Sequence, residues 1–187
     1  MAPLADLPDH HDLPHLRAAL EHVKQFRCAV EGGAHRGIWT RVLGEWFRKV
    51  VAFEPVPELA FQVTGASQMF VAALGNVTRQ VGFQAGHQNT GQGHVSLDRE
   101  MMVQMYRLDD FGLEEVDFLK LDVEGYELPA LIGAQDLIAR CRPAILVEQN
   151  RLSERYGYTD AELGVWMSDH EYRHEAQWNK DHLYLPA

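Results

Sequence analysis

Short, mostly apolar segments alternate along this chain with longer segments in which apolar residues recur at every third or fourth position. The short segments span residues 28–30, 50–53, 70–74, 116–121 and 144–147. A short apolar run bounded by turn residues is typical of a strand buried on both faces, as in parallel sheets. The helical segments between the runs supply the crossovers that parallel pairing requires. The alternation therefore predicts an α/β fold in which helices cover both faces of a parallel sheet.

The remaining segments complete this expectation. Helical spacing and helix-start signals predict four helices, at 13–26, at 37–48, from Pro129 through Ile138, and after a Thr159–Glu162 capping box. Residues 77–103 suggest short extended pieces, and the alternation in 172–178 and 182–185 predicts an antiparallel hairpin.

Charge and composition narrow the class of protein. The chain has 27 acidic and 17 basic side chains, a net charge of −10, which disfavours a nucleic-acid-binding protein with its basic stripe. No stretch reaches the roughly 18 apolar residues of a membrane helix, and residues 1–15 lack the order of a signal peptide. Cys28 and Cys141 lie far apart and are expected to be core residues. We expect a cytoplasmic protein without membrane association.

A glycine-rich turn follows the first predicted strand, with the sequence Glu31-Gly-Gly-Ala-His-Arg-Gly37. Glycines at such a turn let the backbone approach a ligand, and the helix that begins at Gly37 presents unpaired N–H groups. Glu54 follows about 20 residues later at the end of the second strand, where an acid can accept hydrogen bonds from both ribose hydroxyls. The pattern predicts a site for a nucleoside cofactor.

Two nucleoside cofactors compete for this turn. A dinucleotide site would have Gly-x-Gly-x-x-Gly, whereas Ala34 occupies the position of the second glycine. An S-adenosylmethionine site places an acid ahead of the glycines, near the methionine ammonium, and Glu31 occupies that position. The leading acid favours S-adenosylmethionine.

Six blocks in order resemble the FkbM-type methyltransferases, a branch of the class I S-adenosylmethionine-dependent enzymes. The blocks are 31–37, 53–57, 73–75, 108–111, 118–127 and 142–148. The most specific of them reads Lys120-Leu-Asp122-Val-Glu124-Gly-Tyr-Glu127. The resemblance covers about residues 28–150.

The resemblance implies a Rossmann-like fold: a seven-stranded, mostly parallel sheet with helices on both faces and an antiparallel last strand. It implies methylation of a hydroxyl on a sugar or another small metabolite. We expect a single domain over residues 1–187, with a leader and helix in 1–26, the family core in 28–150, and a helix and hairpin in 151–187.

Carried over position by position, the resemblance also assigns cofactor-binding residues. The methionine end would lie against Glu31, Gly32, Gly33, Ala34, His35 and Gly37, with Asp122 beneath the sulfonium. Glu54 would hold the ribose, while Pro55, Val56, Ala73 and Leu74 would surround the adenine.

Methylation of a hydroxyl is accelerated by a general base, typically by about 10²–10⁴-fold. The candidates at the expected strand ends are Asp122, Glu124, Glu148 and His35. Alternation along a strand would turn Asp122 and Glu124 to the same side, and clustered carboxylates raise one another's pKa. The same acids can instead bind a hard divalent cation that acidifies the hydroxyl. Base and cation stay open as alternatives.

Several neighbouring residues carry weaker expectations. Lys120 lies within a strand and is expected to form a structural ion pair. Glu127 either takes part in the chemistry of the acidic block or only caps the helix that follows it. His87 and His94 flank the polar loop 89–93, where the resemblance places substrate-facing residues.

Two other functions remain alternatives to catalysis by methyl transfer. One is a catalytically degenerate protein that binds S-adenosylmethionine or a partner, and the other is a nicotinamide-dependent oxidoreductase. The expected partner is a small hydroxylated acceptor rather than nucleic acid, and the oligomeric state stays open.

Overall fold

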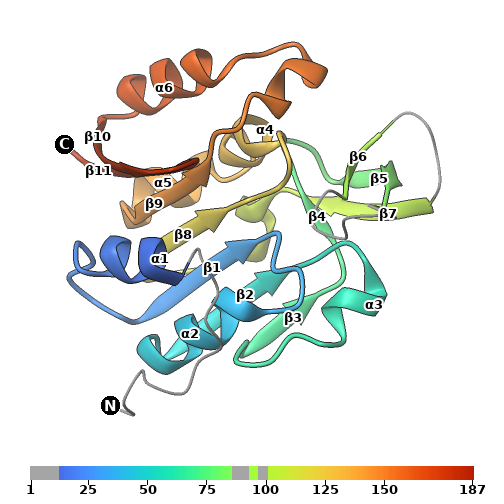
Figure 1. Ribbon diagram of the computed structural model, residues 1–187, viewed down its shortest axis with the longest axis horizontal. Helices are drawn as coiled ribbons and strands as arrows, with labels where there is room; N and C mark the ends of the chain where they lie inside the picture. The colour runs from blue at the N-terminus through green and yellow to red at the C-terminus, as the bar shows by residue number, and fades with distance from the viewer. Residues whose placement is uncertain (1–12, 86–92, 97–100) are drawn as a thin grey trace.

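The computed structural model describes residues 13–85, 93–96 and 101–187. These residues form a seven-stranded sheet in the order β10-β11-β9-β8-β1-β2-β3 (Figure 1). Its strands are β1 (Cys28–Gly32), β2 (Lys49–Phe53), β3 (Gln68–Phe70), β8 (Val116–Leu121), β9 (Ala144–Glu148), β10 (Tyr172–Trp178) and β11 (Asp181–Pro186).

Parallel pairing joins the five strands from β9 to β3, and β11 runs antiparallel to both β9 and β10. This is the predicted fold class, with an antiparallel last strand and a C-terminal hairpin. The central strands β1, β2, β8 and β9 are almost wholly buried, as expected for strands covered on both faces. Parallel strands end at the same edge of a sheet, so the segments after β1, β2, β8 and β9 meet there (Figure 1).

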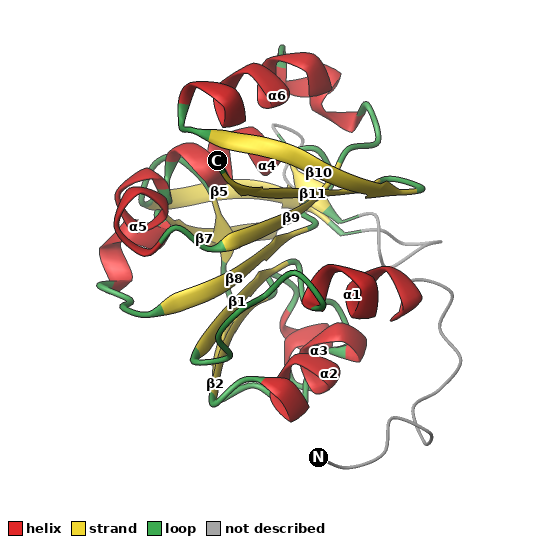
Figure 2. Cartoon of the chain, turned by 90° about the vertical axis from the view of Figure 1, so that its left-hand side faces the viewer, coloured by secondary structure: helices red, strands yellow, loops and turns green. Residues whose placement is uncertain are grey.

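Helices cover both faces of this sheet (Figure 2). On one face, α1 (Leu13–Leu20) and α2 (Ile38–Trp46) share a core that includes Leu16, Leu43 and Phe118. On the other face lie α4 (Glu127–Ile132), α5 (Gln135–Cys141) and α6 (Asp160–Asp169), packed on Leu119 and Ile145. Each large side chain buried in these layers contributes about 1.5–3 kcal/mol.

A second, four-stranded sheet follows the order β4-β7-β5-β6. Its strands are β4 (Ala73–Leu74), β5 (Arg79–Gln84), β6 (His94–Val95) and β7 (Met101–Tyr106). The prediction of a single strand over 70–74 is wrong. The chain bends at Val71, where the Ala72 N–H donates to the Phe70 carbonyl at 3.0 Å, so Phe70 ends a strand of the main sheet and Ala73 begins one of the second.

Three predicted helices also have other bounds than expected. The helix predicted over 37–48 spans only Ile38–Trp46. The helix from Pro129 through Ile138 is in fact two helices, divided at Gly133, where the chain passes so close to the Gly75 carbonyl that an added Cβ would lie 1.9 Å from its oxygen. The opening helix ends at Leu20 rather than Phe26. The Thr159–Glu162 capping box begins α6 as predicted.

The short elements complete the chain: α3 (Pro57–Ala60), and the 3₁₀ helices η3 (Leu108–Phe111) and η4 (Leu152–Tyr156). Cys28 is buried and Cys141 partly exposed, and both are free thiols. Within the described ranges, none of the helices combines the length and the apolar composition that a membrane span requires.

Candidate active site

A cavity of about 380 Å³ opens at the carboxyl edge of the main sheet, where the segments after β1, β2, β8 and β9 meet. Most residues assigned to the site from the sequence line it: Glu31, Gly33, Ala34, His35, Glu54, Pro55, Val56, Ala73, Leu74, Asp122, Glu124 and Glu148. The second sheet contributes apolar side chains to the opposite wall, among them Phe83 and Val95.

Gly32 and Gly37 were assigned to the cofactor, but they do not line this cavity. Gly32 is the last residue of β1, and an added Cβ there would lie 2.9 Å from Leu74 Cδ1. Gly37 precedes α2 at φ 77° and packs against Val63. Both glycines therefore shape the turn through packing and backbone conformation, whereas Gly33, Ala34 and His35 between them line the cavity.

Gly33 is the residue on which the turn depends. Its φ of 79° favours glycine, and an added Cβ would lie 1.8 Å from the Asp122 carbonyl oxygen. The loop after β1 therefore touches the backbone that follows β8 with no space for a side chain. This contact joins the segment that carries Ala34 and His35 to the segment that carries the acids.

Glu54 holds its carboxylate in a fixed orientation at the end of β2. Its side chain is buried, Oε2 accepts from the His35 N–H at 2.9 Å, and Oε1 accepts from the Val56 N–H at 2.9 Å. Burial raises the pKa of Glu54, while these two N–H groups lower it. Each oxygen keeps a second lone pair, so the carboxylate can still accept hydrogen bonds from a ligand in the cavity.

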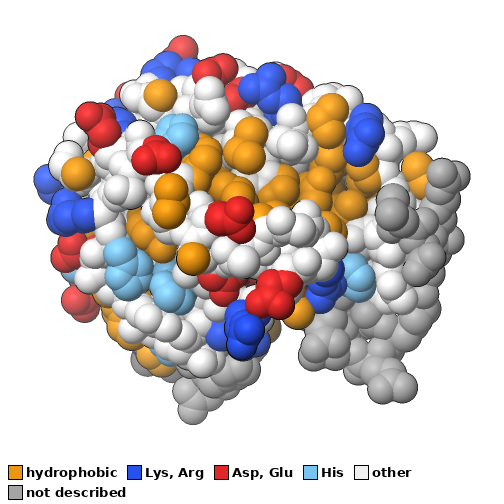
Figure 3. All heavy atoms as spheres, turned by 90° about the horizontal axis from the view of Figure 1, so that it is seen from above, with side chains coloured by type: hydrophobic (Ala, Val, Ile, Leu, Met, Phe, Trp, Pro, Cys, Tyr) orange, Lys and Arg blue, Asp and Glu red, His pale blue; other side chains and the backbone are white. Residues whose placement is uncertain are grey.

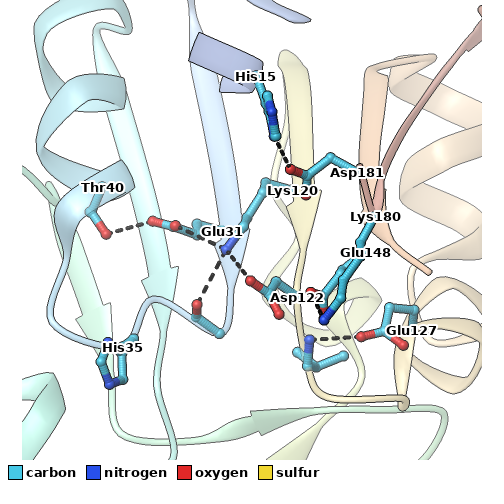
Figure 4. Close-up of polar contacts among 12 residues, drawn as sticks. His15, Glu31, His35, Thr40, Lys120, Asp122, Glu127, Glu148, Lys180 and Asp181 are labelled. Atoms are coloured by element: carbon cyan, nitrogen blue, oxygen red, sulfur yellow. Dashed lines mark hydrogen bonds and ion pairs between the residues drawn. The ribbon is translucent and has the colours of Figure 1, made fainter. Parts of the chain in front are cut away.

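Glu31 is buried and bonded to protein partners, whereas its predicted role was to bind the methionine ammonium of the cofactor (Figure 4). It is 1% exposed, its Oε1 lies 3.4 Å from Lys120 Nζ, and the Thr40 hydroxyl donates to its Oε2 at 2.5 Å. Burial raises the pKa of Glu31 and Lys120 opposes that shift. The predicted ion pair of Lys120 is present, and it engages the carboxylate that the sequence assigned to the methionine ammonium.

Asp122, Glu124 and Glu148 gather as the sequence predicted, but for a different reason. One carboxylate oxygen from each lies within 4.8 Å of the others. Strand β8 ends at Leu121, and the chain then turns, with Glu124 at φ 55° and Gly125 at φ 94°. A left-handed turn, and not alternation along a strand, therefore brings Glu124 beside Asp122.

The cluster is a site where carboxylates retain protons. Burial raises the pKa of Glu124 to about 7, and the charge of Asp122 adds to this shift. Burial also raises the pKa of Glu148 well above its usual range, with further contributions from Asp122 and Glu124. Such a cluster can hold a proton to be exchanged, or it can offer three oxygen ligands to a hard cation.

Glu127 stabilises the turn after β8 by accepting hydrogen bonds from its backbone. Its Oε1 accepts from the Val123 N–H at 2.9 Å and from the Gly125 N–H at 3.2 Å, and its side chain is buried. Burial raises its pKa to about 8. Glu127 is absent from the cavity lining, which agrees with the structural alternative for this residue.

The structure also reveals cavity residues that sequence reasoning missed. Asn179 and Lys180 of the β10–β11 turn and Asp181, the first residue of β11, line the cavity, and Lys180 Nζ lies 3.8 Å from Glu148 Oε1. His15 of α1 contacts Asp181, with 2.8 Å between Nδ1 and Oδ2 (Figure 4). Tyr126 also lines the cavity and follows the acid turn directly. The one sequence signal that could have identified Tyr126 is its position within the Lys120–Glu127 block.

Histidine contributes less than expected to the acid cluster. The His35 ring points away from Asp122 and Glu148, so the structure does not bring this candidate base to them (Figure 4). His94 belongs to β6. His87 and most of the loop 89–93 lie outside the described residues.

Comparisons with known proteins agree with this arrangement. The family model "Methyltransferase FkbM domain" matches residues 31–174. A methyltransferase FkbM from Methylobacillus flagellatus KT has 21% sequence identity and a TM-score of 0.58, covering 85% of this chain and 43% of that one. A precorrin 8w decarboxylase from Methanobacterium thermoautotrophicum has 16% identity and a TM-score of 0.53, covering 96% and 92%.

At these identities, likeness to the solved structures establishes the fold alone. This chain spans less than half the length of the Methylobacillus protein. The curated proteins contain no significant match. The match of the family model extends from Glu31 into β10 and includes the glycine turn, Glu54 and the acid cluster. This chain therefore belongs to the FkbM methyltransferase domain family, whose members use S-adenosylmethionine, as its six sequence blocks predicted.

Proposed function

We propose that this protein transfers the methyl group of S-adenosylmethionine to a hydroxyl oxygen of a small metabolite, with a sugar as the first candidate. The observation that carries the proposal is the placement of two different carboxylate sites in one cavity. Glu54 lies at one side, and the cluster of Asp122, Glu124 and Glu148 lies at the other. The first suits a ribose, and the second suits a hydroxyl that must lose its proton.

The donor side of the cavity fits the cofactor. Its volume lies within the roughly 300–1,000 Å³ typical of small-ligand pockets. Glu54 offers lone pairs to the ribose hydroxyls, and Pro55, Val56 and Leu74 provide an apolar wall for the adenine. With Glu31 engaged by Lys120 and Thr40, Asp122 is the more exposed carboxylate, and it suits the sulfonium charge, which S-adenosylhomocysteine lacks. When bound, the cofactor supplies an electrophilic methyl group on a sulfonium.

The acceptor side supplies the base. As the acceptor oxygen bonds to the methyl carbon and the carbon–sulfur bond breaks, the hydroxyl proton passes to a carboxylate of the cluster. Glu124 suits this transfer because its pKa is raised to about 7, near the working pH. Glu148 shares the cluster and contacts Lys180, so it can orient the acceptor beside Glu124.

A small acceptor also agrees with the surface charges. On the face in Figure 3, Lys and Arg side chains stand singly among acidic and hydrophobic ones, and the described residues of this face form no basic stripe. With a net charge of −10, the protein would repel a nucleic-acid backbone. The proposed partner is therefore a small hydroxylated molecule in the cytoplasm.

A screen of hydroxylated metabolites with methyl-labelled S-adenosylmethionine tests the proposal. We expect label on an acceptor oxygen, and Glu124→Gln should lower turnover by about 10²-fold or more while S-adenosylhomocysteine binding stays within about threefold. Asp122→Asn and Glu148→Gln complete the series. Loss of activity with a chelator and its return with a divalent cation would select the cation alternative.

The other outcomes separate the alternatives. Binding of S-adenosylhomocysteine without turnover on any acceptor would favour a degenerate cofactor-binding protein. Calorimetric binding of NAD, without binding of S-adenosylhomocysteine, would favour an oxidoreductase.

A further inference from the structure

Lys120 places a buried ammonium group against three oxygen atoms of the cavity wall, two from the end of β1 and the loop after it and one from the turn after β8. Its Nζ lies 3.4 Å from Glu31 Oε1, from the Gly33 carbonyl oxygen and from Asp122 Oδ2. The side chain is 6% exposed, and Nζ lies 4.9 Å from the centre of the Trp39 ring. Because an ammonium has three N–H donors, these three oxygens account for all of them.

The loop after β1 and the turn after β8 are in close contact. Gly33 packs directly on the Asp122 backbone, where even a Cβ would overlap the carbonyl oxygen. Lys120 spans the same junction through the Asp122 side chain. Two contacts therefore join the loop after β1 to the turn after β8: the backbone packing of Gly33 on Asp122, and the Lys120 cation that binds both segments (Figure 4).

The two carboxylates that share this cation differ in what else they can do. Glu31 is fully buried and has the Thr40 hydroxyl as a second partner. The Asp122 side chain is 37% exposed, and it faces the cavity beside Glu124 and Glu148. The two carboxylates therefore share one cation, and Asp122 is the member that a ligand in the cavity can reach.

We propose that Lys120 is a positioning residue for methyl transfer, which acts by fixing the Asp122 carboxylate where the donor and acceptor halves of the cavity meet. The proposal rests on the function proposed above and extends it to a residue that the reacting groups do not touch. In-line transfer depends on alignment, and a displacement of about 1 Å can lower a rate by about 10²-fold. Lys120 therefore acts on turnover through Asp122.

The test must separate this role from a role in folding. Lys120→Met alone leaves Glu31 buried without its cation, which is strongly destabilising. The main variant is therefore Lys120→Met combined with Glu31→Gln, which removes the pair as a neutral unit. Thr40→Val is the matched control, because it removes the other partner of Glu31 and leaves the contact between Lys120 and Asp122 in place.

We expect the main variant to fold and to bind S-adenosylhomocysteine within about threefold of wild type, but to lose about 30-fold or more in kcat. Lys120→Arg should recover part of that loss because it retains the charge. Thr40→Val should keep kcat within about threefold of wild type at a temperature where it is folded. Thermal melting, calorimetry and kcat with the acceptor from the screen provide these measurements.

A double-mutant cycle with Asp122→Asn identifies the residue through which Lys120 acts. In the Asp122→Asn background, the Lys120 and Glu31 changes should lower kcat by less than about twofold, because the positioned group is already lost. Multiplicative losses, or wild-type kcat in the main variant, would overturn the proposal. A wild-type protein that methylates no acceptor would instead overturn the proposed function on which it rests.

Discussion

At the scale of single residues, the site is organised by carboxyl groups with different partners. Glu54 is held by two backbone N–H groups, Glu31 by a cation and a hydroxyl, and Glu127 by the turn that it supports. Glu124 and Glu148 have raised pKa values through burial and the nearby charge of Asp122. Acids of the same type therefore take different roles, which their environments decide.

The first prediction concerns Glu54. Glu54→Ala should weaken binding of S-adenosylhomocysteine by at least about tenfold, because each lost charge-assisted hydrogen bond is worth about 1.5–3 kcal/mol. Isothermal titration measures the affinity, and Glu58→Ala, an exposed acid of α3, is the control. Unchanged affinity in a folded Glu54→Ala variant would mean that the ribose binds elsewhere.

Sequence reasoning anticipated that the acids meet and that Lys120 forms an ion pair, but it missed Asn179, Lys180 and Asp181. Asp122, Glu124 and Glu148 follow buried strands, so their meeting at one edge could be anticipated. Lys180 and Asp181 could not, because their approach depends on the register of β11, which pairs Asp181 with Glu148. No local pattern in the chain encodes that register.

At the scale of elements, the loop after β1 and the helices after β8 depend on contacts that a sequence pattern does not reveal. The strand over 116–121 could be predicted to the residue, since an apolar run with turn residues on both sides leaves little choice. The run over 70–74 is equally apolar, yet it is divided between two sheets. Local hydrophobicity predicts that a segment is buried, but does not predict against which sheet.

The second prediction tests the turn at Gly33. Gly33→Ala should reduce both stability and S-adenosylhomocysteine affinity, because the new Cβ must displace the Asp122 carbonyl as well as adopt a positive φ. Gly112→Ala is a matched control: its φ is 56°, and a Cβ there would meet nothing within 4 Å. The control should lose only about 1–3 kcal/mol of stability and keep its affinity. Equal behaviour of the two variants in denaturant unfolding and titration would contradict the close contact.

The third prediction concerns the start of α5. This helix has no cap from its own preceding residue, and Asp109 of η3 takes that role by accepting from the Leu137 N–H at 2.9 Å and the Asp136 N–H at 3.3 Å. Asp109→Ala should lower the free energy of unfolding by about 1–2 kcal/mol, as for other lost caps. Urea unfolding measures the loss, and the exposed Glu114 provides a control substitution to Ala that should change little.

At the scale of the whole molecule, the buried acids make stability depend on pH. Burial raises the pKa of Glu127 to about 8 and that of Glu124 to about 7, and raises that of Glu148 as well. The folded state therefore holds protons that the unfolded chain releases near pH 4.5. The contribution of these groups to the free energy of unfolding is therefore complete below that pH, and it declines as the pH rises toward and through their folded pKa values.

The fourth prediction follows from this decrease of stability with rising pH. Without ligand, the melting temperature should fall between about pH 5 and pH 9, and Glu127→Gln should flatten the decline between about pH 5 and pH 8 because it cannot ionise. Glu114→Gln, an exposed acid, should leave the profile unchanged. Differential scanning calorimetry over this range measures both. A melting temperature that rises with pH would show that these carboxyl groups are ionised in the folded protein.

The position of β11 between β9 and β10 leaves β10 at one edge of the main sheet. An edge strand offers unpaired backbone groups to strands of other molecules, and charged side chains on it oppose such pairing. β10 exposes Arg173, His174 and Glu175. β11 instead brings Leu183 and Tyr184, both buried between its two neighbours. The order of the hairpin therefore places the polar strand where it disfavours aggregation through the sheet edge.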